Sequence, residues 1–278
     1  MQLKAKIRNL ATEKNISPQL VLQNYMLERF LKRISLSKFR DNFIIKGGLL
    51  ISSMIGIDSR TTMDIDTTIK SLPLSEGSIR ELFTEICTIS ADDDISFVVK
   101  QIEPIRGNDE YGGYRVHLLA GYDPMSVSIK ADVTAGDIIT PKEIDYSYMP
   151  MFSDELIQIK SYNLETLLAE KLETIISRSV LNTRPRDFYD IYILRRFFSD
   201  RIDYNLLTEA LRATAKKRGS ISAIENHEAI LLAIETDENM QNRWDGYSKT
   251  YSYSKGIGFT KAIEAVRDLL IRSHAESL

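Results

Sequence analysis

The stretch from residue 43 to residue 67 constrains the fold of this chain most, because it joins a glycine pair to two carboxylates. The apolar run Phe43–Lys46 leads straight into Gly47 and Gly48, and Asp64-Ile-Asp66 follows a second apolar segment. An apolar run that ends in glycines predicts a strand followed by a tight turn into a short helix. Side chains alternate along a strand, so both aspartates lie on one face of the next strand. The pattern predicts an α/β unit whose sheet has one packed face and one polar face.

The composition is that of a globular protein with more than one packed core. The 278 residues are 43% hydrophobic and 27% charged, which is more length than one small core needs. A net charge of -3 argues against binding nucleic acid through overall charge, so any polyanion must meet a local basic patch. Cys87 is the single cysteine, which excludes an internal disulfide framework. Without a signal-peptide pattern or a membrane-spanning apolar run, we expect a cytoplasmic protein with no membrane partner.

Hydrophobic periodicity predicts a mixed sheet in the first half of the chain and helices in the second. After a leading helix over about Ser17–Ile34, the expected elements are strands at Phe43–Lys46, Met63–Ile69, Ile95–Ile102, Tyr114–Ala120 and Val127–Val133, with a helix at Ile79–Ile89. Later helical periods cover Leu164–Ser177, Arg186–Phe198, Tyr204–Ala213, His227–Ile234 and Phe259–Ile271. The polar, proline-punctuated stretch between Thr140 and Asn163 is the expected boundary. We therefore predict an α+β chain in three parts: a helical segment over residues 1–40, a sheet core over 41–155 and a helical domain over 156–278.

A third acid, Asp132, lies in a segment that also alternates like a strand. Apolar residues at 127, 129, 131 and 133 alternate with polar ones, among them Asp132. If this strand pairs with the strand of Asp64 and Asp66, three carboxylates converge on one face. Such acids repel one another unless a cation neutralises them, and Mg²⁺ prefers oxygen ligands and substrate phosphates. The three acids therefore predict a magnesium site able to support nucleotidyl transfer.

The glycine pair suits the binding of phosphate. Gly47 and Gly48 lack side chains, so backbone N–H groups at the start of a helix can approach the β and γ phosphates of a nucleotide. The alternative is structural: a tight turn for the glycines and a solvated edge strand for the acids. A tight glycine turn or a solvated edge strand is common when it occurs alone. The glycine pair followed by the two acids, in this order, favours a catalytic site.

Two stretches resemble known families. A strand, Gly-Gly, a short helix, Asp-x-Asp and a later strand aspartate resemble the nucleotidyltransferase superfamily that includes DNA polymerase β, over roughly residues 43–133. The segments Leu167-Leu-Ala-Glu-Lys171-Leu-Glu and Arg184-Pro-Arg-Asp187-Phe-Tyr-Asp190-Ile resemble the AbiEii/AbiGii toxin family of type IV toxin–antitoxin and phage-defence systems. The resemblance implies a polymerase β-like nucleotidyltransferase lobe with a C-terminal helical lobe.

The resemblance also implies an activity and partners. It implies a nucleotidyltransferase toxin of an abortive-infection system that moves NMP from an NTP to an RNA, with the tRNA 3′ end as the expected acceptor. A cognate antitoxin with a winged-helix DNA-binding domain is the expected protein partner. By position, the nucleotide-binding turn is matched by Gly47 and Gly48, the metal ligands by Asp64 and Asp66, the third carboxylate by Asp132, the family lysine by Lys171, and the later acid by Asp187 or Asp190. Gly48 departs from the many members that have serine, so backbone contacts must hold the phosphate there.

The residues around Lys171 leave two readings open. Lys171 falls within an apolar stripe on a helix that begins near Asn163, so its ammonium either reaches a buried or cleft-facing anion or extends to solvent. A triphosphate is one such anion, and a structural ion pair is the alternative. Asp187 sits in the first turn of the next helix, where the helix dipole favours an acid. Asp190 is expected to face a polar partner such as Lys171, Arg184 or Arg186.

Two rival functions fit the same residues. The predicted metal site would support transfer to a protein hydroxyl or a small molecule equally well. Alternatively, the chain is a noncatalytic NTP-binding module. A weaker signal, the cations and aromatics from Arg243 to Lys255, is typical of base stacking, with packing of a helical core as its alternative.

Overall fold

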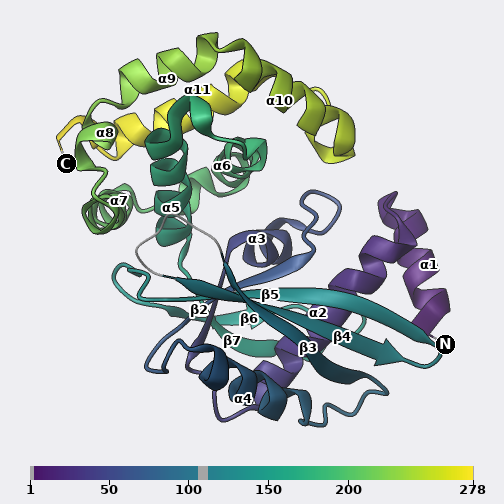
Figure 1. Cartoon of the computed structure of the whole chain (residues 1–278). Helices are drawn as coiled ribbons and strands as arrows, with labels where there is room; N and C mark the ends of the chain where they lie inside the picture. Colours follow the sequence, from purple (N-terminus) through teal and green to yellow (C-terminus); the bar gives the residue numbers. More distant parts are fainter. Residues whose placement is uncertain (1–2, 106–111, 278) are drawn as a thin grey trace. The chain divides into compact units, whose positions relative to one another are not determined.

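A seven-stranded mixed sheet forms the centre of the first half of the chain in the computed structural model, which describes residues 3–105 and 112–277 (Figure 1). The strand order is β3-β4-β5-β2-β1-β7-β6. The strands are β1 Phe43–Lys46, β2 Asp64–Ile69, β3 Ser96–Ile105, β4 Gly113–Tyr122, β5 Met125–Ala135, β6 Ile144–Tyr148 and β7 Ile157–Ser161. Strand β2 pairs antiparallel with β1 and parallel with β5, and β1 pairs parallel with β7. The sheet is mixed, which confirms the predicted α+β fold class.

Helices cover both faces of this sheet. Helix α2 (Pro18–Leu36) begins at Ser17, whose hydroxyl accepts the N–H of Leu20 at 3.2 Å. Its Phe30 ring packs 5.6 Å from the Phe83 ring of α4 (Glu76–Cys87), so α2 and α4 share one layer. Helix α3 (Gly47–Ile55) lies on the face of the sheet opposite α4 (Figure 1). The short α1 (Leu3–Lys14), which periodicity did not predict, packs on α2.

The chain divides into two compact units. Unit 1 comprises Met1–Asp137 and Glu143–Tyr162, and unit 2 comprises Ile138–Lys142 and Asn163–Leu278. The chain passes between the units at Lys142–Glu143 and at Tyr162–Asn163, both within the stretch from Thr140 to Asn163 where a boundary is expected, and the residues between these two points form β6 and β7 of unit 1. Strand β7 pairs with β1 and β6 pairs with β7, and alternating residues of β7 are buried. The division into parts 1–40, 41–155 and 156–278 stays a prediction.

Unit 2 is helical. Its helices are α5 Leu164–Arg178, α6 Pro185–Phe198, α7 Tyr204–Arg218, α8 Ile221–Glu225, α9 His227–Thr236, α10 Glu238–Thr250 and α11 Phe259–Arg272, with 3₁₀ segments at Ser179–Leu181, Ser199–Arg201, Ser252–Ser254 and Ala275–Ser277. Asn163 caps α5 as expected, since its side chain accepts the N–H of Thr166 at 2.8 Å. The core contains Phe259, which packs on Phe188 and on Trp244 at ring distances of 5.3 and 5.5 Å.

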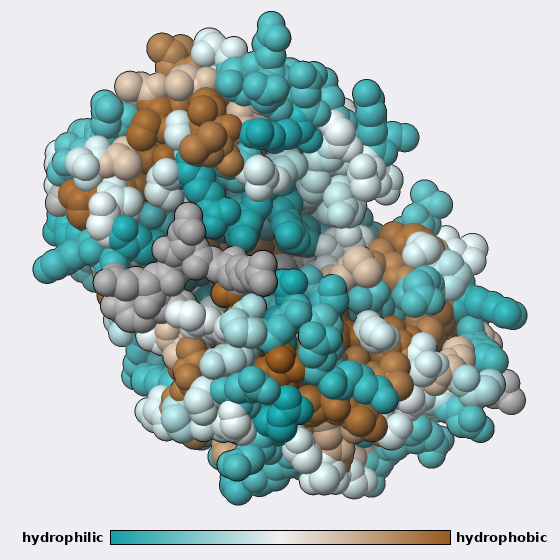
Figure 2. Space-filling view, in the orientation of Figure 1, coloured by the Kyte–Doolittle hydropathy of each residue, from teal (hydrophilic) through white to brown (hydrophobic). Residues whose placement is uncertain are grey.

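The surface mixes polar and apolar residues. On the face drawn in Figure 2, hydrophobic residues form separate patches between hydrophilic ones. Across residues 3–105 and 112–277, none of the helices combines the length and the hydropathy needed to cross a lipid bilayer.

Candidate active site

Four charged residues form one row across the polar face of the sheet. Asp66 on β2 lies beside Asp132 on β5, since these residues are register partners in the parallel pair. The register also places Arg115 of β4 beside Asp132 and Lys46 of β1 beside Asp66. Partners in a sheet project to the same side, so the row runs Arg115, Asp132, Asp66, Lys46. The two acid-bearing strands pair, as three converging carboxylates require.

The glycine turn folds around Asp66. The N–H of Gly48 donates to Asp66 Oδ2 at 3.0 Å. Gly47 has a φ of +62°, and a methyl group added there would overlap the Asp66 carboxylate. Position 47 therefore requires glycine for both its backbone conformation and its closeness to the acid. The predicted strand, turn and helix bring the glycine pair into contact with the Asp-x-Asp strand.

The surroundings of Asp64 disfavour its charged form. Burial raises its pKa most, and the charges of Asp66 and Asp132 raise it further. Lys130, its register partner, and Arg115 lower the pKa only in part. A cation bound to Asp64 and Asp66 would relieve this repulsion, because two carboxylates on one strand face are hard oxygen donors. The chemistry of this donor pair fits a divalent ion such as Mg²⁺.

Asp132 is already held by a cation of the protein. Arg115 donates from Nε to Oδ1 and from Nη2 to Oδ2, each at 2.7 Å. This hydrogen bonding raises the pKa of Arg115. In the part of the chain that the structure describes, no group of three His, Cys, Asp or Glu side chains is arranged to hold a metal. Sequence reasoning missed Arg115, and the signal that finds it is its register with Asp132, which needs the strand pairing.

The surroundings of Gly48 account for the absence of serine there. A Cβ at Gly48 would lie 2.9 Å from Thr62 Oγ1 and 3.2 Å from Arg60 Nη2. A side chain at this position would therefore crowd a hydroxyl and a guanidinium that already flank the turn. Arg60 is only 4% exposed. Both residues lie just before the Asp-x-Asp strand, and sequence reasoning missed them.

Lys171 is held by both acids that the sequence offered as alternatives. Its Nζ lies 2.9 Å from Asp187 Oδ1 and 2.7 Å from Asp190 Oδ2. The three side chains are 12%, 10% and 0% exposed, respectively. A lysine between two buried acids is fixed in place, and each acid is partly neutralised by the same ammonium. This ion-pair network lies entirely within unit 2.

The aromatic segment of unit 2 has a buried part and a surface part. Trp244 and Tyr247 are buried, which supports core packing for these two residues. Tyr251 is 38% exposed and stacks on Tyr253, with ring centres 5.4 Å apart and an interplanar angle of 26°. Lys249 and Lys255 beside them are exposed. The surface part keeps the residue types that bind single-stranded nucleic acid.

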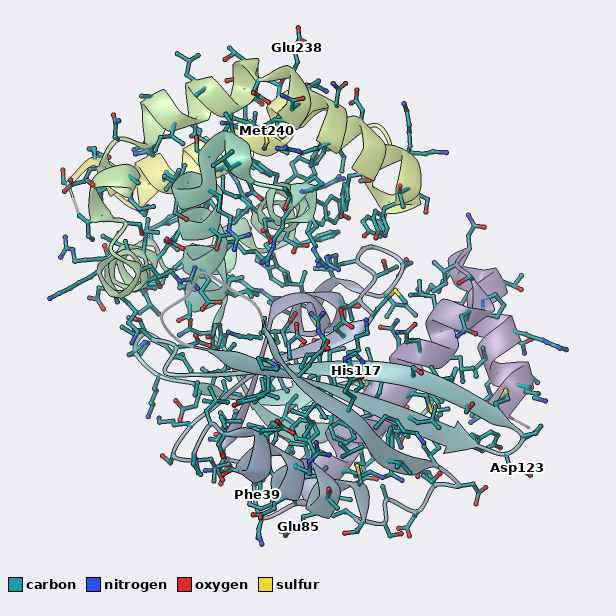
Figure 3. All side chains as sticks on the ribbon, viewed as in Figure 1. Phe39, Glu85, His117, Asp123, Glu238 and Met240 are labelled. Carbon is teal, nitrogen blue, oxygen red and sulfur yellow. The ribbon has the colours of Figure 1, made fainter. Side chains whose placement is uncertain are left out.

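His117 is a strand residue, as expected. It lies on β4, where its Nε2 is 3.0 Å from Glu103 Oε1 of β3 (Figure 3). The pairing ties two neighbouring strands at the polar face of the sheet. His117 therefore has a carboxylate partner rather than a nucleophile beside it.

Comparison with known proteins gives a consistent picture. The profile of the AbiEii family, described as a nucleotidyl transferase toxin of a type IV toxin–antitoxin system, matches residues 29–269. The fold is similar to that of JHP933 from Helicobacter pylori, with a TM-score of 0.54 and 10% identity over 94% of each chain. It is also similar to a candidate nucleotidyltransferase from H. pylori, with a TM-score of 0.52 and 12% identity over 94% of this chain and 98% of the other. No curated protein sequence matches the chain.

Proposed function

Because the chain belongs to the AbiEii family of type IV nucleotidyltransferase toxins, we propose that it transfers NMP from an NTP to an RNA with the help of a divalent cation at Asp64 and Asp66. The observation that carries this proposal is the row of charges on the sheet, in which the glycine turn contacts Asp66. A glycine turn suited to binding phosphate would then lie beside hard oxygen donors. Such a pairing suits phosphoryl chemistry, which depends on positioning and charge stabilisation.

The reaction needs no protein nucleophile. The 3′ hydroxyl of the acceptor loses its proton to water and its oxygen forms a bond to the α phosphorus, the bond from that phosphorus to the bridging oxygen breaks, and pyrophosphate leaves. Mg²⁺, when bound, would neutralise phosphate charge and favour the ionised form of the attacking hydroxyl. Asp64 and Asp66 would hold the ion, and Asp132 is the candidate for a third ligand or for the group that polarises the hydroxyl. Gly47 and Gly48 would leave room for the phosphates beside the start of α3.

In unit 2, Lys171 is the candidate for stabilising phosphate charge. The family resemblance implies this role, and its ion pairs with Asp187 and Asp190 support a lysine whose position is fixed. Asp187 and Asp190 are then positioning residues. The sequence left open whether Asp187 or Asp190 is the functional acid, and we propose that both act through Lys171.

The acceptor is proposed to be RNA, with the tRNA 3′ end as the first candidate. The stack of the exposed Tyr251 on the half-buried Tyr253, between Lys249 and Lys255, supports a single-stranded acceptor. Bases stack on aromatic rings, and lysines contact phosphates. Because the net charge of the chain is -3, phosphates must be bound by local groups of basic residues rather than by overall charge. Modification of tRNA in the cytoplasm would block translation and growth, which suits an abortive-infection toxin opposed by an antitoxin with a winged-helix domain.

Labelled transfer tests the proposal directly. The full chain is incubated with each α-labelled NTP, Mg²⁺ and total cellular RNA, beside the variant Asp66→Asn. Asparagine keeps an oxygen that can accept the N–H of Gly48, so the turn is retained while a charged metal ligand is lost. We expect a labelled RNA band that disappears with EDTA and falls by about a hundredfold or more in the variant.

Other outcomes identify the rivals. Label on a protein or on a small molecule, with none on RNA, would replace the acceptor but keep the metal site. Absence of transfer with all four NTPs, together with growth inhibition that Asp66→Asn and Lys171→Met leave intact, would favour a noncatalytic binding module.

A further inference from the structure

Arg115 forms hydrogen bonds to both carboxylate oxygens of Asp132, the third acid of the proposed site. The guanidinium makes two hydrogen bonds of 2.7 Å to Asp132, one to each carboxylate oxygen. Both side chains are partly shielded, with 35% of Arg115 and 20% of Asp132 exposed. Strand pairing fixes the geometry, because the two residues are direct register partners on β4 and β5. This is a bidentate pair of the kind that gives strong and directional binding.

The pair conflicts with a metal role for Asp132 in the same arrangement. A divalent ion at Asp132 would lie close to a guanidinium that never loses its charge, and like charges repel. Consistent with this, no three-carboxylate metal group occurs among the described residues. Among the residues that the structure describes, neither Asp64 nor Asp66 has a guanidinium or ammonium bonded to both of its carboxylate oxygens. The metal site in this arrangement consists of two acids.

We propose that Arg115 is a positioning residue that keeps Asp132 from binding the metal until an anion binds the guanidinium in place of Asp132. The inference rests on the proposed function, because the anion in question is the triphosphate of the bound NTP. Arginine binds phosphate oxygens with the same fork that binds a carboxylate, so one can replace the other. The first ion then binds through Asp64 and Asp66 alone. Asp132 becomes available as a third ligand only when the nucleotide is present.

Manganese binding to the full chain, freed of metal with EDTA and then dialysed, tests this order without nucleotide. Free Mn²⁺ is measured by electron paramagnetic resonance for wild type, Asp66→Asn, Asp132→Asn, Arg115→Met and the double variant Arg115→Met/Asp132→Asn. We expect Asp66→Asn to abolish binding and Asp132→Asn to change the affinity by less than about twofold. Arg115→Met should bind Mn²⁺ at least about tenfold more tightly, because a third carboxylate joins the site.

The double variant separates two causes of tighter binding. Removal of a positive charge alone would raise the affinity with or without Asp132. If Asp132 is released to the metal, the gain disappears in Arg115→Met/Asp132→Asn, which is a double-mutant cycle. Glu103→Gln is the matched control, because Glu103 is the register partner of Arg115 on β3 but does not bond Asp132. It should leave Mn²⁺ affinity unchanged.

A second measurement examines the anion. Binding of inorganic tripolyphosphate in EDTA, followed by calorimetry, should weaken about tenfold in Arg115→Met and less in Arg115→Lys, which keeps the charge but not the fork. Far-UV circular dichroism confirms that each variant is folded.

The results that overturn the inference are distinct. If Asp132→Asn weakens nucleotide-free Mn²⁺ binding as much as Asp66→Asn does, Asp132 is already a ligand. If Arg115→Met binds Mn²⁺ like the wild type, or if the double variant keeps the gain, Arg115 does not withhold Asp132. If wild-type binding is absent or insensitive to Asp66→Asn, the proposed metal site fails and this inference fails with it.

Discussion

The two units differ in whether the protein itself neutralises a cluster of acids. In unit 2, Asp187 and Asp190 are both within 2.9 Å of the Lys171 ammonium, so the protein supplies the counter-charge. In unit 1, Asp64 and Asp66 share a strand face, and burial and mutual repulsion raise the pKa of Asp64. The first cluster contains its own counter-ion as folded, although Asp187 Oδ2 is buried without a hydrogen-bond partner among the described residues, whereas the second is under repulsion that a bound cation would relieve. Repulsion between acids costs stability that the rest of the fold must supply. A protein that retains such repulsion commonly does so at a functional site.

A similar contrast holds for single buried glutamates. Glu173 in unit 2 accepts from Arg218 at 2.5 Å and from Ser220 at 2.8 Å. Glu28 in unit 1 accepts the N–H of Met151 at 2.7 Å and contacts Arg29 at 3.1 Å. Burial outweighs these bonds and raises the pKa of Glu28 to about 7. Unit 1 thus carries a second acid whose charge is disfavoured.

The largest expected effect is the loss of the lysine from the acid cluster of unit 2. Lys171→Met leaves two buried carboxylates without their cation, and this should lower the stability of unit 2 by about 3–5 kcal/mol. Trp244, the single tryptophan, is buried in unit 2, so its fluorescence during urea unfolding reports on this unit.

The variant Lys171→Met/Asp187→Asn/Asp190→Asn is the matched control. It removes the uncompensated charges as well as the lysine, so it should recover part of the lost stability. A midpoint for Lys171→Met equal to that of wild type would break the comparison, because the cluster would then not be structural.

The next effect depends on pH and concerns Glu28. Its pKa is raised from 4.5 to about 7 in the folded protein, so the protonated form is favoured. The stability that this group contributes is fully present below about pH 4.5 and is lost as the pH rises through about 7. Glu28→Gln should abolish this dependence and be more stable than wild type at pH 8, relative to pH 4, by at most about 3 kcal/mol.

Hydrogen exchange of peptides from α2, measured across pH, follows the effect in unit 1. Glu173→Gln is the contrasting variant, since it loses an ion pair with Arg218 and should destabilise unit 2 at neutral pH. Equal responses of the two variants at pH 8 would remove the difference between the units.

The elements that carry the site follow from the sequence because local patterns specify them. An apolar run that ends in glycines predicts β1, alternation predicts β2 and β5, and the register of the structure places Asp66 beside Asp132. The Gly47 turn is also local, since its φ of +62° requires a residue without a side chain. The strands and the turn depend on residues close together in the chain, whereas the closeness of Asp66 and Asp132 depends on the pairing of β2 with β5.

The features that escaped prediction depend on distant partners. Strand β6 lies between Pro141 and Pro150, and β7, which follows Pro150, is recognised only through its parallel pairing with β1. Helix α10 is mostly polar, with Met240, Trp244 and Tyr247 as its buried residues, although Asp237 caps it by accepting the N–H of Met240 at 2.8 Å. The bond between Arg115 and Asp132 requires the pairing of β4 with β5, which sequence patterns alone do not specify.

A smaller effect compares two left-handed glycines. Gly47 and Gly219 have φ values of +62° and +67°, but a methyl group at Gly219 meets nothing within 4 Å. Alanine at either site costs roughly 1–2 kcal/mol for the backbone conformation. Gly47→Ala should cost more, because the Asp66 carboxylate must move, and should also abolish NMP transfer. Hydrogen exchange of α3 and of the last turn of α7 measures the loss of stability at each site. Equal losses for Gly47→Ala and Gly219→Ala would show that Asp66 does not crowd the turn.

The smallest expected effect has the opposite sign and tests the repulsion itself. Asp64→Asn removes a charge that Asp66 and Asp132 disfavour, so the variant should be more stable than wild type in EDTA at pH 7.5 by about 0.2–1 kcal/mol. Because the pKa of Asp64 is raised, the difference should shrink as the pH falls and wild-type Asp64 becomes protonated. Excess MgCl₂ should stabilise wild type but not the variant, since only the wild type binds the ion with both acids. Hydrogen exchange of β2 under the two conditions gives both differences, and a variant less stable than wild type in EDTA would mean that the acids of unit 1 are as well compensated as those of unit 2.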